Sequence, residues 1–358
     1  MPRRFILPLA LLLSGPLANA QAIQIGVLGL FHPQELTLSA AHSEAVLVTI
    51  ADQSFVLAPN TPRDIARIKI TGKTFSIEIK GQILQAKEIR ATSRANTAVA
   101  FVLSVPEKIS RQYRGSLAIT AAAANTIQPI ITMDLETAVA SAVLAESAPG
   151  TPLEALKAQS IVTRSYYVGG AGRHENFDFC DLTHCQSLRE PPAPDSPAVQ
   201  ATAATQGLVI TYGEKPIATM FTRSCGGRTR TPAELGLPTK SYPYFAVLCD
   251  ICHKNPIRWT RRVSTEDAAI LAKGEAGRLT VDRRLGWHAV PSNNFAARPE
   301  NKNDNAQVLL EGIGQGHGIG LCQRGASAMA RTGATFREIL AHYFPNTSLT
   351  SIAPPSNR

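Results

Sequence analysis

Two consecutive helical segments separated by a Pro-Gly pair constrain the fold of this chain more than any other feature. Leucine and valine side chains recur at helical spacing over residues 135–143, and the Pro-Gly pair at 149–150 ends this first helix. A second helix is expected to run to about residue 169, with Thr151 as N-cap, Pro152 as its first residue and Glu154 completing a capping box. The sequence therefore predicts a helix–turn–helix corner with a cleft at its mouth.

Glu146 lies at this corner and is the candidate catalytic residue. It follows Val143 by three positions, so it continues the apolar face of the first helix. A carboxyl held against apolar side chains loses hydration, which disfavours its charged form and suits a general acid. The spacing leaves an alternative open, in which Glu146 is a boundary residue whose carboxylate extends into solvent.

Residues 1–20 have the pattern of a secretory signal peptide. Arg3 and Arg4 precede an apolar run, and Ala18-Asn19-Ala20 provides a small-residue cleavage site. We therefore expect a secreted, periplasmic or cell-wall-associated protein without a further transmembrane span. The net charge of +9 suits an anionic cell-wall polymer or an anionic membrane surface. Export and the lack of a nucleic-acid-binding motif argue against nucleic acid as the partner.

The remaining chain is predicted to have an α+β fold in two parts. Short β-prone runs separated by turn residues predict a β-rich accessory region over residues 21–111. A mixed α/β catalytic domain with long loops is expected over 112–350, including a Pro-rich loop at 188–199 and a capping box at Thr335 and Glu338. Residues 351–358 are expected to form a disordered tail.

A cluster of soft ligands follows the second helix. His174, Cys180, His184 and Cys185 lie within twelve residues and match a Cys2His2 zinc site in ligand type, although not in zinc-finger spacing. With four protein ligands, such a zinc would be structural, because no position stays open for water. In an oxidising compartment the alternative is a disulfide between Cys180 and Cys185.

The other cysteines carry a weaker signal. Cys249 and Cys252 form a C-x-x-C pair without a thioredoxin-like βαβ pattern, for which we favour a structural disulfide. Cys225 and Cys322 could approach each other and pair, but the sequence does not assign their connectivity. Glycines alternate on both sides of His317 in a segment that fails both the P-loop and the dinucleotide-binding patterns. A tightly packed turn with His317 satisfied internally is the alternative to a binding role.

Several ordered motifs resemble the SpoIID/LytB family, which joins stage II sporulation protein D with the amidase enhancer LytB. They include YRGSLAI from Tyr113, AES around Glu146, EALKAQSIVTRSYY from Glu154, SCGGRT from Ser224 and GQGHGIGLCQRGASAMARTG from Gly314. FREILAHYFPNT follows at residues 336–347, and the resemblance covers roughly residues 112–350. Motifs in a fixed order are more specific than any one of them.

The resemblance implies a lytic transglycosylase that cuts peptidoglycan glycan strands, preferring strands stripped of peptide, with Glu146 as general acid/base. It also implies zinc at the His/Cys cluster instead of a disulfide. The residues read as substrate-binding are Lys157, Arg164, Ser224, His317 and Gln323.

The LytB side of the family implies a rival function, a non-catalytic enhancer of an N-acetylmuramoyl-L-alanine amidase. A third interpretation, a metal-dependent hydrolase using the His/Cys cluster, is disfavoured because four protein ligands leave no open coordination position.

Overall fold

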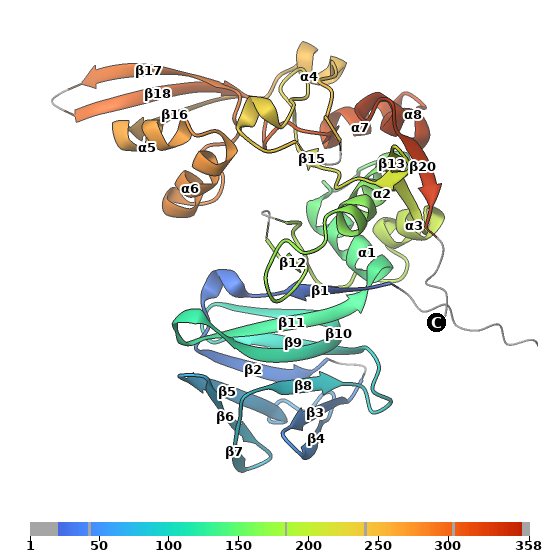
Figure 1. Ribbon diagram of the computed structural model, residues 1–358, viewed down its shortest axis with the longest axis vertical. Helices are drawn as coiled ribbons and strands as arrows, with labels where there is room; N and C mark the ends of the chain where they lie inside the picture. The colour runs from blue at the N-terminus through green and yellow to red at the C-terminus, as the bar shows by residue number, and fades with distance from the viewer. Residues whose placement is uncertain (1–20, 42–43, 183–184, 240–241, 303–304, 353–358) are drawn as a thin grey trace, which may run out of the picture.

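The computed structural model describes residues 21–41, 44–182, 185–239, 242–302 and 305–352. It confirms an α+β, β-rich fold, with a large sheet, a group of helices next to it and a smaller module that projects from the helices (Figure 1). The signal peptide expected at residues 1–20 lies outside the described residues.

The large sheet has twelve strands, with β12-β1-β11-β10-β9-β2-β5-β6-β7 as its main path and β3, β4 and β8 attached through β10. Alternating burial along the strands, as in β5, places one face on the core. The strands are β1 (Ala22–Gly26), β2 (Glu35–Ala40), β3 (Val46–Ile50), β4 (Gln53–Leu57), β5 (Ile65–Thr71), β6 (Thr74–Ile79), β7 (Gln82–Ala86), β8 (Ile89–Thr92), β9 (Val99–Val105), β10 (Ile109–Ala122), β11 (Thr126–Asp134) and β12 (Phe179–Cys180).

The sheet extends beyond the predicted accessory region. The expected border between residues 111 and 112 falls inside β10, whose first half pairs with β9 and whose second half pairs with β11. Strand β11 leads directly into the first helix, so the sheet is the platform from which the helical corner starts. Short 3-10 helices occur at Gly29–Phe31, Ala123–Asn125 and Ala233–Leu235.

The helical corner is present as α1 (Leu135–Glu146) and α2 (Leu153–Gly169). Helix α1 begins at Asp134, whose side chain accepts the Thr137 N–H at 2.9 Å, which satisfies one of the donors at the helix start. Helix α2 is buried on nearly all sides because it contacts α1, α3 (Pro197–Ala204), α7 (Gln323–Arg331), α8 (Phe336–Tyr343) and β13 (Leu208–Tyr212).

The predicted capping box of α2 is wrong. Pro152 occupies the N-cap, and the Thr151 hydroxyl instead donates to the Ala148 carbonyl at 2.6 Å. Glu154 does not cap its own helix: one of its oxygens binds Lys157 of α2, and the other accepts the N–H of Phe336 at the start of α8. The acid therefore joins two helices that lie far apart in the sequence.

The C-terminal elements pack on the other side of α2. They are β14 (Lys215–Pro216), β15 (Phe221–Thr222), α4 (Asp250–Lys254), β19 (Leu321–Cys322) and β20 (Ser348–Ser351). The capping box of α8 at Thr335 and Glu338 is confirmed. Strand β20 pairs with β13, and the Ile352 N–H donates to the Gly207 carbonyl, so ordered pairing reaches two residues into the segment expected to be a tail. Residues 353–358 lie outside the described residues.

The projecting module lies between α4 and β19 in the sequence and has its own core (Figure 1). Its core includes Trp259 and Leu310. Buried Arg278 forms ion pairs with Glu275 at 2.7 Å and Asp282 at 2.8 Å. The module consists of β16 (Arg258–Ser264), α5 (Thr265–Leu271), α6 (Glu275–Leu285), β17 (Phe295–Lys302) and β18 (Asn305–Ile313).

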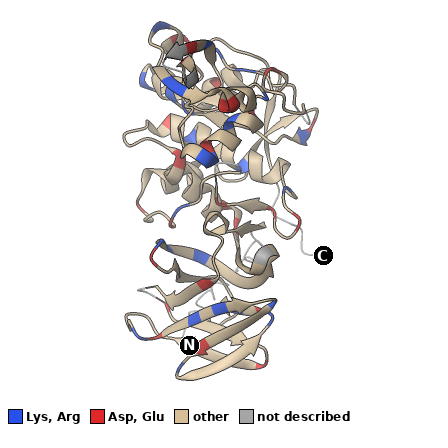
Figure 2. Ribbon diagram, turned by 90° about the vertical axis from the view of Figure 1, so that its left-hand side faces the viewer, with Lys and Arg blue, Asp and Glu red and all other residues tan. Residues whose placement is uncertain are grey.

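In the part of the chain that the structure describes, no helix combines the length and the apolar character needed to cross a membrane. Basic and acidic residues are interspersed along the molecule, in the sheet as well as in the helices (Figure 2). The excess of positive charge therefore does not by itself point to one binding surface, and the site must be located from its local geometry.

Candidate active site at the helical corner

The carboxyl of Glu146 lies at the C-terminal end of α1 and is half-buried. The buried face of α1 ends at Val143, so Glu146 is placed between the two sequence interpretations, neither enclosed nor fully solvated. Its Oε1 accepts the Ser187 N–H at 2.9 Å. Its Oε2 makes no hydrogen bond with the residues that the structure describes. One oxygen is thus fixed while the other stays available.

Tyr167 of α2 lies next to this carboxyl. Burial, followed by the nearby thiol of Cys185 and the charge of Glu146, raises the pKa of Tyr167 above its ordinary value. The sequence analysis missed Tyr167, because in the sequence it reads as one more apolar position of a buried helix.

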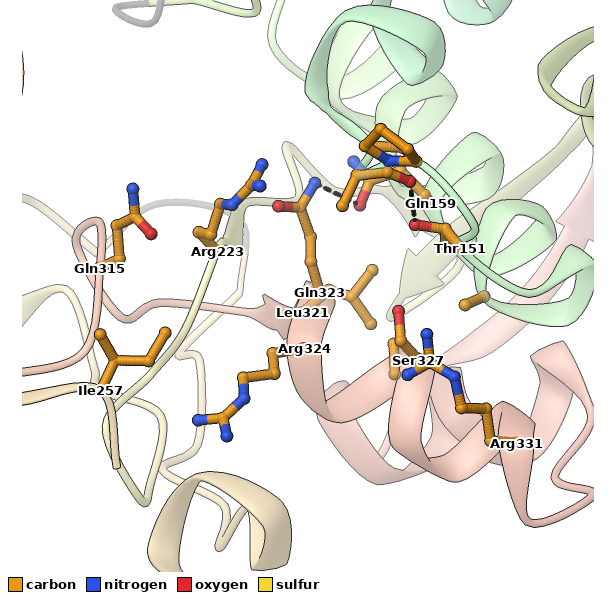
Figure 3. A pocket seen from close by; sticks show the side chains of 15 residues that line it. Thr151, Gln159, Arg223, Ile257, Gln315, Leu321, Gln323, Arg324, Ser327 and Arg331 are labelled. Carbon is orange, nitrogen blue, oxygen red and sulfur yellow. Dashed lines mark hydrogen bonds between the residues drawn. The ribbon is translucent and has the colours of Figure 1, made fainter. Parts of the chain in front are cut away.

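A pocket of about 260 Å³, lined by both polar and apolar side chains, adjoins the corner and begins at Ser147, directly after Glu146. Gln323, the first residue of α7, points into it beside Gln159 of α2 (Figure 3). The Gln323 amide donates to the Glu146 carbonyl at 3.0 Å and lies 3.5 Å from the Gln159 amide oxygen. The pocket is smaller than most small-molecule sites, so it suits a single group of a larger ligand.

The pocket is cationic. Arg223, Arg324 and Arg331 line it, whereas no Asp or Glu is among its lining residues. The Arg324 guanidinium donates to the Asn255 carbonyl. Within the described part of the chain, the guanidinium groups of Arg223 and Arg331 form no ion pair or hydrogen bond, which leaves both available to an anion. The sequence analysis missed all three arginines, because nothing local in the sequence shows that they converge.

Two of the predicted substrate-binding residues have partners within the protein. Arg164 is completely buried, and its guanidinium binds both carboxylate oxygens of Glu136, at 2.9 and 2.6 Å. The structure therefore contradicts a sugar-binding role for Arg164, since its charge is neutralised in the interior. Lys157 is ion-paired with Glu154 at 2.6 Å, and this contact lowers the pKa of Glu154. Lys157 is not among the pocket residues.

Ser224 and His317 are likewise not among the residues that line the pocket. Ser224 is 1% exposed, so its hydroxyl cannot reach a glycan in this structure. The Nδ1 atom of His317 accepts the Ile319 N–H at 3.0 Å, and burial lowers the pKa of His317 although the charge of Glu275 opposes that shift. This placement agrees with the alternative of a packed turn. Of the predicted binding residues, Gln323 is the one that lines the pocket.

The predicted His/Cys cluster forms beside Glu146. The ligand atoms of His174, Cys180 and Cys185 all lie within 4.8 Å of one another, with His174 Nε2 3.4 Å from Cys185 Sγ. The fourth predicted ligand, His184, lies outside the described residues. Two thiolates and an imidazole are ligands that zinc prefers, so the donor set fits this ion.

The remaining four cysteines also come together. Cys225, Cys249, Cys252 and Cys322 are buried and none is in a disulfide. The expected disulfide between Cys249 and Cys252 is therefore absent. The sequence reasoning considered these cysteines in pairs, whereas the fold brings all four to one point.

Comparisons with known proteins agree with the sequence motifs. Residues 123–212 match the SpoIID family of stage II sporulation proteins. The chain is 29% identical to an uncharacterised protein of Brachyspira hyodysenteriae over 234 residues, which are 56% of this chain and 62% of that protein. It is also 23% identical over 237 residues to the stage II sporulation protein D of Bacillus amyloliquefaciens, covering 55% of this chain and 68% of that protein. The SpoIID/LytB resemblance is thereby confirmed.

The amidase enhancer of Bacillus subtilis shares 46% identity over 50 residues, which are 14% of this chain and 7% of the enhancer. The aligned regions thus cover less than two thirds of the length of this enhancer and of the Brachyspira protein. The SpoIID match spans β11, the helical corner, the His/Cys cluster and β13. It therefore contains Glu146 and Tyr167, whereas the pocket arginines lie beyond it.

Proposed function

We propose that this protein is an exported lytic transglycosylase that cuts the bond between N-acetylmuramic acid and N-acetylglucosamine in peptidoglycan, with Glu146 as general acid/base. The observation that carries the proposal is the Glu146 carboxyl, held through one oxygen by the Ser187 N–H, next to a cationic pocket whose lining begins at Ser147. The similarity to stage II sporulation proteins and to an amidase enhancer supports peptidoglycan as the substrate class.

In the proposed reaction Glu146 acts twice. Its protonated carboxyl donates to the glycosidic oxygen while the C1–O bond breaks and positive charge develops on the muramyl ring. The resulting carboxylate then accepts the proton of the muramyl C6 hydroxyl as O6 bonds to C1, which closes an anhydro ring and restores the acid. No water is consumed, and no second carboxylate is needed.

The arginines provide a reason for a preference for stripped strands. Removal of the peptide leaves a free lactyl carboxylate on each muramyl residue, whereas an intact strand has an amide at that position. Arg223 and Arg331 are exposed cations at the pocket, and a guanidinium can bind a carboxylate through two parallel hydrogen bonds. We propose that they bind these carboxylates and thereby place the adjacent glycosidic bond at Glu146.

Replacement of Arg223 by alanine is expected to raise KM for stripped glycan roughly 10-fold to 100-fold, because a charge-assisted hydrogen bond contributes about 1.5–3 kcal/mol. The value of kcat should change less, since the proton-transfer group is intact. Arg94→Ala is the matched control, since it removes the same charge from an exposed loop between β8 and β9. Steady-state kinetics at two salt concentrations measures both effects. Equal KM values for the two variants would contradict the assignment.

We also propose that His174, Cys180, His184 and Cys185 hold a structural zinc. Such an ion would be a Lewis acid held by four protein ligands, without chemistry of its own in the reaction. The proposed ion would act on the reaction through the position of the chain. Cys185 lies two residues before Ser187, whose N–H holds the Glu146 carboxyl. A fixed loop here therefore keeps the acid oriented.

Cys185→Ser is expected to remove one zinc per chain, to lower the thermal stability and to reduce kcat, because the Ser187 loop loosens. Metal analysis by mass spectrometry and a thermal melt measure the first two effects. The prediction is contradicted if wild-type protein lacks zinc and peptide mapping finds Cys180 and Cys185 joined in a disulfide.

The rival function, an enhancer of a wall amidase, is supported by the 50-residue similarity to the Bacillus subtilis protein. One experiment separates the two. Protein lacking residues 1–20 is incubated with amidase-stripped glycan, and the products are analysed by mass spectrometry. A transglycosylase releases 1,6-anhydromuramyl ends. Absence of any product, together with faster amide hydrolysis by an added amidase on intact peptidoglycan, would favour the enhancer.

A further inference from the structure

A second cluster of thiols lies outside the His/Cys cluster and is formed by the other four cysteines. The sulfur atoms of Cys225, Cys249, Cys252 and Cys322 all lie within 4.8 Å of one another, and those of Cys252 and Cys322 are 3.6 Å apart. Each of the four residues is at most 2% exposed. Three segments of the chain supply the four sulfurs, because Cys249, the N-cap of α4, and Cys252 lie in the same turn.

The spacing of the sulfurs fits one metal ion. A disulfide requires about 2.05 Å between its sulfurs, and none is formed here. A zinc ion with four sulfurs at about 2.3 Å in a tetrahedron places them about 3.8 Å from one another. We propose that Cys225, Cys249, Cys252 and Cys322 bind a structural zinc ion as a tetrathiolate site.

The surroundings stabilise thiolates. The N–H groups of Cys225 and Gly325 both donate to Cys322 Sγ at 3.4 Å, and the Tyr343 hydroxyl donates to Cys249 Sγ at 3.4 Å. The Ser224 hydroxyl lies 3.4 Å from Cys252 Sγ and can donate to it as a thiolate. Such hydrogen bonds orient metal ligands and reduce the charge that they carry into a buried site.

The local backbone is arranged around the sulfurs. Cys322 is the N-cap of α7, where the positive end of the helix dipole favours a thiolate. At Gly325 a Cβ atom would lie 2.6 Å from Cys249 Sγ, so a residue without a side chain is needed there. The two glycines after Cys225 adopt φ values of 79° and 131°, which L side chains rarely adopt.

Zinc fits better than the alternatives with sulfur ligands. A tetrahedral set of four thiolates holds either zinc or an iron–sulfur centre. A four-iron cluster inserts iron and sulfide between the cysteines and would need their sulfurs farther apart than a single ion does. Zinc, unlike an iron–sulfur centre, is redox-inert and therefore needs no electron-transfer partner.

The site connects the pocket to the projecting module. Cys252 and Cys322 lie 70 residues apart in the sequence and enclose the whole of that module between them. Cys322 directly precedes Gln323, and Cys225 follows Arg223 by two positions. Each of these two pocket residues is therefore close in the sequence to a proposed metal ligand. We therefore expect the ion to fix the base of the module and one wall of the pocket.

The test is the zinc content of full-length mature protein, purified without chelators, for wild type, Cys252→Ser and Cys185→Ser. Cys252→Ser is expected to contain one zinc per chain fewer than wild type. In Cys185→Ser, which removes a ligand of the other cluster, X-ray absorption at the zinc edge should find sulfur ligands at about 2.3 Å and no nitrogen. This second measurement applies even where Cys252→Ser does not fold.

Three results would overturn the proposal. One is an unchanged zinc content in folded Cys252→Ser. Another is disulfide-linked peptides among these four cysteines in wild-type protein, mapped under non-reducing conditions. The third is an absorption spectrum with an iron–sulfur band, which would show that the site holds a cluster and not zinc. None of these readouts depends on glycan cleavage, so the site is tested independently of the proposed function.

Discussion

Replacing Glu146 by glutamine is expected to reduce the cleavage of stripped glycan by at least ~10²-fold, the lower limit for loss of a positioned acid–base group. In the proposed reaction the same carboxyl first donates a proton to the glycosidic oxygen and then accepts one from the C6 hydroxyl. An amide can do neither. Glutamine keeps a carbonyl oxygen that can accept the Ser187 N–H, now 2.9 Å from Glu146 Oε1. The local fold should therefore be preserved, and the loss should appear in kcat.

The matched control is Glu88→Gln, which makes the same chemical change at an exposed position beside Arg90 in the sheet. Its activity should equal that of wild type. Thermal melts of both variants should coincide with the wild-type melt. If Glu146→Gln retains the wild-type rate, Glu146 is not the acid, and an amidase-stimulation assay with the same variant would show whether the enhancer function persists.

Glu136→Ala is expected to lower the free energy of unfolding by about 3–5 kcal/mol, because it leaves a buried cation without its partner. The Arg164 side chain is 0% exposed and binds both oxygens of Glu136. After the substitution, its described partners would be two carbonyl oxygens, of Leu208 at 3.0 Å and Thr202 at 3.3 Å. Denaturant titration followed by circular dichroism measures the change.

An exposed ion pair provides the comparison. Arg90 and Glu88 are 71% and 42% exposed, so Glu88→Ala should change the free energy of unfolding by less than about 1 kcal/mol. Replacing both members of the buried pair, as Glu136→Leu with Arg164→Met, should cost less than Glu136→Ala alone. Equal effects of Glu136→Ala and Glu88→Ala would show that the buried pair does not stabilise the helical corner.

The helical corner could be predicted because its signals are local. Apolar spacing and the Pro-Gly break define α1 and α2, and the capping box of α8 is confirmed. The order of the strands in the large sheet could not be predicted, since each strand's pairing depends on partners elsewhere in the sheet. For the same reason Glu154 was expected to cap the start of α2, although one of its oxygens binds the start of α8, which is distant in the sequence.

The candidate site could be predicted in part. Glu146, Gln323 and the His/Cys cluster lie within motifs whose chemistry can be read from neighbouring residues. The buried partner of Arg164 and the convergence of the pocket arginines depend on contacts between distant segments. The four-cysteine cluster is the clearest case, since 70 residues separate two sulfurs that lie 3.6 Å apart.

Cleavage of stripped glycan in ¹⁸O-labelled water tests the central claim most directly. If Glu146 transfers the C6 hydroxyl proton and O6 closes the ring, the muramyl product carries no heavy oxygen, and its mass equals that of the product made in ordinary water. Mass spectrometry of the released ends shows whether heavy oxygen has been incorporated. Muramyl ends of unchanged mass, lost in Glu146→Gln and kept in Glu88→Gln, are the predicted result. Reducing ends that contain ¹⁸O from the solvent would mean hydrolysis and would contradict the account.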